Sequence, residues 1–221
     1  MRILTISDLH APFSHPAALD FLADLAREIK PDRVICLGDE IDAHNFARWP
    51  RDWEAPGPRE EIEAARSFLK QLAKLFPVLT VVDSNHTWRP WKVAAAAGLL
   101  PEFLRSRADI LGAPRGWDWV AVERVDDVVF LHGEGYTGDR SAIQAAADYR
   151  CNAVIGHTHS HAGVMHHAKA GGGIWGLNAG CLVDSTQAAF AYGKHSRNKP
   201  VIGTGAVLDG VPVFFPMRGA E

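Results

Sequence analysis

Residues 34–42 read Val-Ile-Cys-Leu-Gly-Asp-Glu-Ile-Asp, an apolar run that stops at a glycine followed by an acid. A short, uninterrupted apolar run predicts a strand that is covered on both faces of its sheet. In open α/β sheets, the loops that leave the carboxyl ends of the strands converge over a crevice in which ligands bind. We therefore expect Asp39, the acid after the glycine, to lie at the ligand-binding edge of a sheet.

Other strand-like runs also end in side chains that can bind a metal ion. Residues 3–7 precede Asp8 and His10, 78–82 precede Asn85 and His86, 128–131 precede His132, and 153–156 precede His157 and His159. Because the carboxyl ends of strands meet at one edge of such a fold, we expect these side chains to converge. The pattern indicates one site built from segments that are far apart in the sequence.

Helical spacing of apolar residues between these runs predicts an α/β fold. One helix is expected from Pro16 to residue 29, and another over 60–76, with acids in its first turn and lysines near its end. The remaining expected elements are helices over 93–97, 102–107 and 141–149, a hairpin of 117–122 with 128–131, and strands over 163–166, 174–177, 201–208 and 211–215. Since helices dominate the front of the chain and strands its end, we expect two sheets packed together.

The composition is that of an ordinary folded protein. The chain has 221 residues, of which 47% are hydrophobic and 22% charged, and we expect a single domain over residues 1–221. A net charge of -3 provides no general field that would gather nucleic acid or an anionic membrane. A polyanionic partner would need a local basic patch.

Cysteine usage and the start of the chain bear on the compartment. The 3 cysteines are odd in number, and Cys36 lies in an apolar run, so free thiols in a reducing compartment are expected. The chain begins with a strand pattern rather than a signal peptide, and no apolar run approaches the roughly 18 residues of a membrane span. We expect a cytoplasmic protein without membrane contact. The sequence does not predict an oligomeric state.

Residues 43–59 break the periodicity and carry large aromatic side chains, including Trp49 and Trp53. We expect an irregular loop that acts as a partial lid and leaves the site fairly open. His44 in this loop is a candidate for substrate contact, because loops after strand ends line binding sites. Arg89 is a candidate for binding a phosphate, and an exposed salt bridge is its alternative role.

The candidate donors are oxygen and nitrogen atoms without sulfur. They come from Asp8, His10, Asp39, Asn85, His132, His157 and His159. A structural zinc ion takes four ligands and usually includes cysteine, whereas two ions can share a bridging carboxylate. Asp39 is the natural bridge. Two divalent ions are expected, with manganese favoured and iron, zinc, cobalt or nickel as alternatives.

In chain order these motifs are Asp-x-His, Gly-Asp-x-x-Asp, Asn-His, His and Gly-His-x-His, and together they resemble the calcineurin-like metallophosphoesterases over residues 8–159. The resemblance implies a four-layer αββα sandwich, in which two mixed sheets are flanked by helices. It implies that one ion is held by Asp8, His10 and His159, that the other is held by Asn85, His132 and His157, and that Asp39 bridges them.

The same resemblance implies that His86 is the catalytic histidine, which contacts the phosphate and protonates the leaving oxygen, and that Asp42 orients it. Two positions depart from the family pattern: Ser84 stands where a glycine is usual, and Thr87 where an acid is usual. We expect the second departure to matter less, because Asp42 can orient His86.

The expected function is hydrolysis of phosphodiester or phosphomonoester bonds by attack of a metal-bridging hydroxide, with His86 as general acid. The expected partner is a phosphate-ester substrate, with nucleotides and nucleic acids among the candidates. One alternative is a non-catalytic scaffold that keeps the fold and binds partners through its surface. A metallo-β-lactamase-like hydrolase is a second alternative, suggested by His157, His159 and His161. It would need an acid where the sequence has Ser160, and it would leave Asp8, His10 and Asn85 unused.

Overall fold

The first sheet is built around the apolar run quoted above. The computed structural model describes residues 1–48, 54–169, 172–187 and 197–219, and its six-stranded sheet has the order β11-β10-β1-β2-β3-β4. Its strands are β1 (Arg2–Ile6), β2 (Arg33–Cys36), β3 (Leu79–Val82), β4 (Trp117–Val120), β10 (Gly203–Leu208) and β11 (Val211–Pro216). Strands β1 to β4 are parallel, so their carboxyl ends lie at the same edge, while β10 and β11 are antiparallel additions.

The second sheet has five strands in the order β5-β6-β7-β9-β8. Its strands are β5 (Glu123–Val125), β6 (Val128–Leu131), β7 (Asn152–Ile155), β8 (Ala162–Lys169) and β9 (Gly172–Ala179). Strands β6, β7 and β9 are parallel, and β5 and β8 pair in the antiparallel sense at the two edges. Both sheets are therefore mixed, as the sequence predicted.

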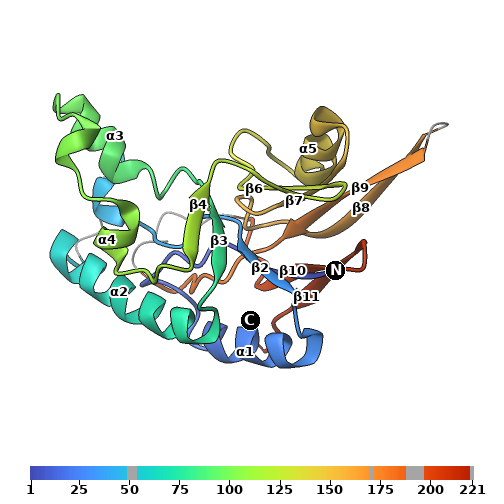
Figure 1. The fold of residues 1–221 in the computed structure, drawn as a ribbon, viewed down its shortest axis with the longest axis horizontal. Coiled ribbons are helices and arrows are strands. Elements are labelled where there is room, and N and C mark those ends of the chain that lie inside the picture. Colours follow the sequence, from blue (N-terminus) through green and yellow to red (C-terminus); the bar gives the residue numbers. More distant parts are fainter. Residues whose placement is uncertain (49–53, 170–171, 188–196, 220–221) are drawn as a thin grey trace.

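Helices cover the outer faces of the two sheets, as Figure 1 shows. The helices that pack on the first sheet are α1 (Ala18–Ile29), α2 (Pro58–Leu75) and α4 (Arg107–Leu111), and α5 (Ser141–Tyr149) packs on the second. The connections contain α3 (Arg89–Ala96) and the 3₁₀ turns η1 (His44–Phe46) and η2 (Pro101–Phe103). This arrangement confirms the predicted four-layer αββα sandwich.

Apolar side chains fill the space between successive layers. Ile35, Phe130 and Leu177 are fully buried between the sheets. Leu22 of α1 and Leu72 of α2 are fully buried in the core beneath the first sheet. Burying one such side chain stabilises the fold by about 1.5–3 kcal/mol.

The two long helices begin and end close to the predicted residues. Helix α1 ends at Ile29, and the Lys30 that follows has a left-handed backbone and precedes Pro31. Helix α2 has Pro58 in its first turn, and Glu60 accepts a hydrogen bond from the Gly57 amide at 2.7 Å. The first turn of a helix tolerates proline because the backbone amides there have no partner within the helix.

Two predicted elements were wrong. Residues 117–122 do not form a hairpin with 128–131, because β4 pairs in parallel with β3 in the first sheet and the hairpin is β5–β6. No α-helix spans 102–107, because the 3₁₀ turn η2 ends at Phe103 and α4 begins only at Arg107. The Ser106 side chain caps α4 by accepting a hydrogen bond from Asp109 N at 3.1 Å. The apolar pattern located the strands in this region, but not the strands with which they pair.

Three further expectations concern the cysteines, membrane-spanning helices and the loop over 43–59. Cys36, Cys151 and Cys181 are buried free thiols, as predicted. In the described parts of the chain, no helix combines the length and apolar character that crossing a membrane requires. Trp49 and Trp53 lie outside the described residues, so the partial lid over 43–59 stays a prediction.

Candidate metal centre

The predicted donors converge at the edge where strands of both sheets end. Those from the first sheet follow β1, β2 and β3, and those from the second follow β6 and β7. Hydrogen bonds join the loops: His10 N donates to Asp39 O at 2.8 Å, and His157 N donates to Asp8 Oδ2 at 3.0 Å. The side chains brought together are those of Asp8, His10, Asp39, Asn85, His132, His157 and His159.

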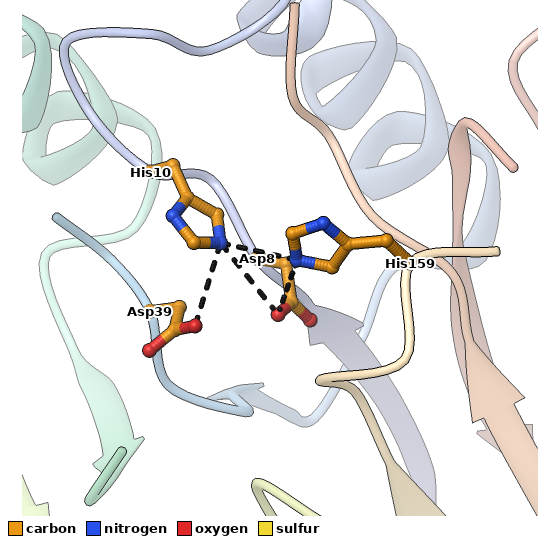
Figure 2. Close-up of side chains that lie close together, drawn as sticks. All are labelled: Asp8, His10, Asp39 and His159. Carbon is orange, nitrogen blue, oxygen red and sulfur yellow. Dashed lines mark hydrogen bonds and ion pairs between the residues drawn. The ribbon is translucent and has the colours of Figure 1, made fainter. Parts of the chain in front are cut away.

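A first group of donor atoms comes from Asp8, His10, Asp39 and His159, whose atoms all lie within 4.8 Å of one another (Figure 2). His159 Nε2 is 3.1 Å from both His10 Nε2 and Asp8 Oδ1. Asp39 Oδ2 lies 3.4 Å from His10 Nε2. This group matches the ligand set that the family resemblance implied for one ion.

A second group comes from Asp39, His132 and His157. His132 Nε2 lies 3.4 Å from Asp39 Oδ2 and 3.1 Å from His157 Nδ1. Asn85 Oδ1 lies 2.8 Å from the same His132 nitrogen. Asp39 Oδ2 therefore belongs to both groups of donor atoms.

The spacing of these atoms fits divalent ions. Nitrogen and oxygen atoms bound to one ion at about 2.1 Å, with bond angles of about 90–110°, lie about 3.0–3.4 Å apart. The His10–His159 and His132–His157 nitrogen pairs, both at 3.1 Å, fall within this range. Carboxylate, imidazole and amide donors are also chemically suited to such ions. The described residues thus contain groups of acidic and histidine side chains that could hold metal.

The backbone of the site is strained. Asp8 (φ 50), His10 (φ 48), Asp39 (φ 49), His157 (φ 70) and His159 (φ 35) all have left-handed backbone conformations, which residues other than glycine rarely adopt. Such strain persists only where the surrounding structure enforces it, and it concentrates at functional sites. These residues are predicted metal ligands, but helix ends and turns such as Lys30 and Asp209 have the same conformation. The conformation shows that the ligands stand in tight loops.

A glycine allows the loops from the two sheets to approach closely. A Cβ atom on Gly156 would lie 2.3 Å from both Asp8 Oδ2 and Ser7 Oγ. The Ser7 hydroxyl also donates to Asp8 Oδ2, which fixes this carboxylate next to Gly156. Any side chain at position 156 would displace Asp8 from the donor group.

Opposite charges shift the pKa values of the acids and histidines in the site. Burial lowers the pKa of His10, but its hydrogen bonds with Asp42 and Asp8 raise that pKa to about 10. Burial also lowers the pKa of His132, yet the charge of Asp39 raises it to about 9. Burial raises the pKa of Asp39, but the charges of His132 and His86 hold it well below its usual value. The raised pKa values favour protonated His10 and His132, whose positive charges lie beside the carboxylates.

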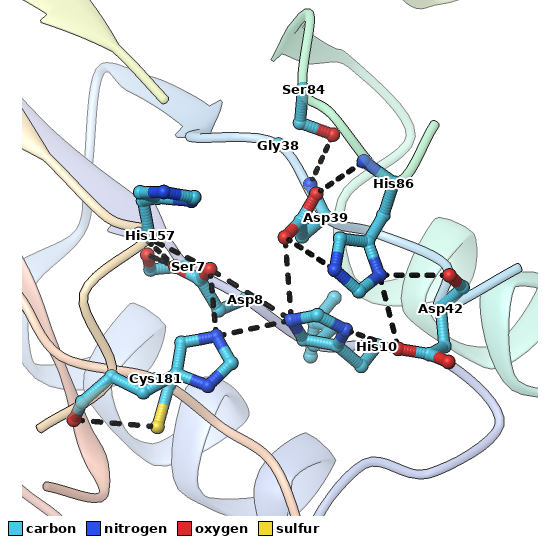
Figure 3. A network of polar contacts seen from close by, with 12 residues as sticks. Ser7, Asp8, His10, Gly38, Asp39, Asp42, Ser84, His86, His157 and Cys181 are labelled. Carbon is cyan, nitrogen blue, oxygen red and sulfur yellow. Dashed lines mark hydrogen bonds and ion pairs between the residues drawn. The ribbon is translucent and has the colours of Figure 1, made fainter. Parts of the chain in front are cut away.

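His86 lies beside the donor groups and contacts Asp42 (Figure 3). His86 Nδ1 is 2.8 Å from Asp42 O and 3.1 Å from Asp42 Oδ1. Arg89 donates from Nη2 to His86 Nε2 at 2.8 Å and from Nη1 to Asp42 O at 2.9 Å. Asp42 Oδ1 is closer still to His10 Nδ1, at 2.7 Å. The sequence carried no signal for this last contact, and Asp42 therefore contacts both histidines.

Two ring-bearing side chains near the site, His44 and Trp88, differ in their surroundings. His44 Nδ1 is 3.5 Å from Asp42 Oδ2, and its buried Nε2 has no hydrogen-bond partner among the described residues. Trp88 packs within the protein, because the Arg107 guanidinium lies 4.7 Å from its ring centroid and the Trp91 ring 5.9 Å away. Trp88 is therefore occupied by packing, whereas His44 has a buried ring nitrogen without a hydrogen-bond partner in the described part of the chain.

The metallo-β-lactamase-like alternative finds no support in this geometry. Asp8 and Asn85, which it would leave unused, lie among the donor atoms. His161, which it would require, lies in none of the metal-binding groups found among the described residues, and its Nδ1 is 3.0 Å from Ser160 Oγ.

The fold and the donor groups define an α/β protein with a candidate metal centre between two sheets. The chain belongs to the calcineurin-like phosphoesterase superfamily, because the model of the calcineurin-like phosphoesterase superfamily domain matches residues 1–194. This membership confirms the family resemblance seen in the motifs.

Sequence relatives include the Gene 54 proteins of two mycobacterial phages. The protein of Mycobacterium phage L5 is 24% identical over 225 residues, covering 87% of this chain and 83% of that protein. The protein of Mycobacterium phage D29 is 26% identical over 219 residues, with 87% and 83% covered. Among solved structures, Yfce, a phosphoesterase from E. coli, is similar with a TM-score of 0.52 at 14% identity, covering 100% of this chain and 96% of that one. This last likeness shows the fold alone.

Proposed function

We propose that this protein is a phosphoesterase that uses two divalent metal ions to hydrolyse phosphodiester or phosphomonoester bonds. The observation that carries the proposal is the position of Asp39 Oδ2, which lies 3.4 Å from His10 Nε2 and 3.4 Å from His132 Nε2. One carboxylate oxygen thereby joins two groups of donor atoms, as a bridging ligand does in two-metal sites.

The ligands divide between the two groups. Asp8, His10 and His159 hold one ion, Asn85, His132 and His157 hold the other, and Asp39 serves both. Manganese is favoured, with iron, zinc, cobalt or nickel as alternatives, because mixed oxygen and imidazole donors suit all of them. When bound, the two ions activate water as the nucleophile and neutralise charge on the phosphate oxygens.

His86 supplies the proton to the leaving oxygen. Its Nδ1 is held by Asp42 O at 2.8 Å, which leaves Nε2 as the nitrogen that can carry the transferred proton. In the structure, Nε2 accepts a hydrogen bond from Arg89 at 2.8 Å. A bound phosphate offers Arg89 a charged acceptor, and movement of the guanidinium to it frees Nε2 to take up a proton from water. The resulting imidazolium then gives this proton to the leaving oxygen.

Arg89 and His44 are the proposed substrate-binding residues. Arg89 is half-buried beside His86, so its guanidinium needs only a local movement to reach an oxygen bound there. Among the described residues, the buried Nε2 of His44 has no hydrogen-bond partner, and a buried polar group without a hydrogen bond is costly. A polar substrate atom is the proposed partner. Nucleotides and nucleic acids are the substrate candidates, and the cytoplasm is the proposed location.

The proposal is tested by hydrolysis of bis-p-nitrophenyl phosphate and p-nitrophenyl phosphate by the purified protein with manganese. Faster turnover of the first identifies a diesterase and of the second a monoesterase. If neither is hydrolysed above the rate of His86→Ala, the catalytic proposal is wrong.

A non-catalytic scaffold with the same fold is the rival outcome. Metal analysis after reconstitution with manganese separates the two. About two ions per chain support the phosphoesterase, whereas less than about one ion favours the scaffold, because binding partners through a surface needs no loaded centre.

A further inference from the structure

The two residues that depart from the family pattern contact each other in the structure. Ser84 Oγ lies 2.8 Å from Thr87 Oγ1, and the two residues are 3% and 0% exposed. They flank Asn85 and His86 in the sequence. Their hydroxyl groups therefore hold the two ends of the turn that carries a proposed ligand and the proposed general acid.

The direction of each hydrogen bond follows from the number of available protons. Thr87 Oγ1 donates its one proton to Glu40 Oε2 at 2.8 Å. Ser84 must then be the donor to Thr87, and its lone pairs accept from the Asp39 amide at 2.8 Å (Figure 3). Glu40 Oε1 accepts from Trp119 Nε1 of β4 at 3.1 Å. A continuous chain of hydrogen bonds runs from the Asp39 backbone to β4.

Steric contact reinforces this chain beside the bridging residue. Gly38 has a left-handed backbone (φ +93), and a Cβ atom there would lie 2.5 Å from Ser84 Cβ. The Asp39 loop and the turn therefore touch directly. His86 N adds a hydrogen bond to Asp39 Oδ1 at 3.2 Å. The carboxylate at position 39 is thus held by the same turn that carries His86.

We infer that Ser84, Thr87 and Glu40, which we call the hydroxyl network, are positioning residues that set the place of the Asp39 carboxylate relative to Asn85 and His86. Their effect on catalysis rests on the proposed function, whereas their effect on the Asp39 loop does not. Buried networks of this kind are sensitive to single deletions, because each lost hydroxyl leaves its neighbour unsatisfied.

The test compares Thr87→Val, which removes the hydroxyl and keeps the shape, with Thr87→Ser, which restores the hydroxyl. Thr204→Val is the matched control: Thr204 is also 0% exposed and donates to Thr5 O at 2.7 Å, but β10 carries no predicted ligand. Hydrogen exchange of the Asp39 amide, manganese affinity and the kinetic constants kcat and KM are measured for each. Ser84→Gly, which introduces the usual family residue, is a second network variant that keeps the test decisive if Thr87→Val does not fold.

We expect Thr87→Val and Ser84→Gly to accelerate exchange of the Asp39 amide and to weaken manganese binding by about tenfold, the worth of one buried hydrogen bond. kcat should fall while KM changes little, and Thr87→Ser and Thr204→Val should remain close to the wild type. Unchanged amide exchange and manganese affinity in both network variants, or an equal loss in Thr204→Val, would overturn the inference. A wild-type protein without activity refutes the proposed function alone, because amide exchange still tests the network.

Discussion

Asp39 carries a carboxylate at a position almost closed to water, with 1% of its surface exposed. A buried charge is costly unless partners of opposite charge surround it. His10 and His132 provide such partners in the structure, each 3.4 Å from the same oxygen. The residue type at this position is therefore explained by the charges that it holds together.

Replacing Asp39 by asparagine keeps the shape of the side chain and removes its charge. We expect Asp39→Asn to reduce manganese affinity by more than about a hundredfold, because even groups that only support metal ligands are worth about 10- to 100-fold. Titration calorimetry measures the change. Asp24→Asn, at an exposed acid in α1, is the control, and equal affinities for the wild type and Asp39→Asn would contradict the assignment.

Replacing His86 separates catalysis from metal binding. We expect His86→Ala to lower kcat by about 10²–10⁴-fold, the usual contribution of a general acid, and to leave manganese content unchanged. His167→Ala, at an exposed position of β8, should leave both unchanged. A variant that loses manganese together with activity would show that His86 serves the metal centre rather than proton transfer.

Protons should compete with metal ions at this site. The pKa values of about 10 for His10 and about 9 for His132 mean that both are protonated below pH 9 in the metal-free protein. Because a ligating imidazole must be neutral, metal binding releases these protons, and affinity falls as the pH falls. Calorimetry in buffers of different ionisation enthalpy should detect the release at pH 7.5. Binding without proton release would contradict this expectation.

At the scale of elements, the parallel strands place their carboxyl ends at one edge, and this arrangement alone assembles the site. Each donor follows the end of β1, β2, β3, β6 or β7. The helices act indirectly, because their apolar faces hold the sheet that positions the loops. Leu72 of α2 is fully buried in this core, whereas Leu75 in the same helix is 39% exposed.

This contrast allows a matched test of helix packing. We expect Leu72→Ala to lower the free energy of unfolding by about 2–5 kcal/mol, through lost burial and the cavity left behind. Leu75→Ala should cost less than about 1 kcal/mol, since it is a partly exposed site. Denaturant unfolding measures both. Equal losses would show that α2 is held by features other than its buried face.

At the scale of the whole molecule, the candidate centre joins two sheets that otherwise meet through apolar packing. The first sheet supplies Asp8 and Asp39 among the donors, and the second supplies His132, His157 and His159. A ligand that binds the folded state alone stabilises it by mass action. Metal ions at this place should therefore stabilise the whole fold.

Removing metal should lower the melting temperature of the protein. At a manganese concentration of about 100 times Kd, binding contributes about 2.7 kcal/mol, which corresponds to about 5–10 °C for a chain of this size. Differential scanning calorimetry with and without a chelator measures the shift. Asp39→Asn should shift by less than about 2 °C, because a hundredfold loss of affinity leaves about 0.4 kcal/mol at the same manganese concentration. The same shift as in the wild type would place the stabilising ion elsewhere.

The motif at each strand end is a local feature, so the sequence alone allowed the family, the two-sheet fold and the set of converging residues to be predicted. The pairing of strands is harder to predict from the sequence, because an apolar run does not specify which other strand lies beside it. For that reason, β4 was placed in a hairpin although it pairs with β3. The start of α4 is a second such case, because the weak helical pattern over 102–107 extends across Ser106, the residue that caps the helix.

The sequence by itself determined which residue types stand at the ends of the strands, since apolar runs and the polar residues after them are adjacent in the chain. Only the tertiary structure decided which atoms face one another: that Asp42 contacts His10 in addition to His86, and that Ser84 meets Thr87 and the Asp39 amide. These contacts join segments from different strands, and their distances depend on backbone conformation and packing over the whole fold.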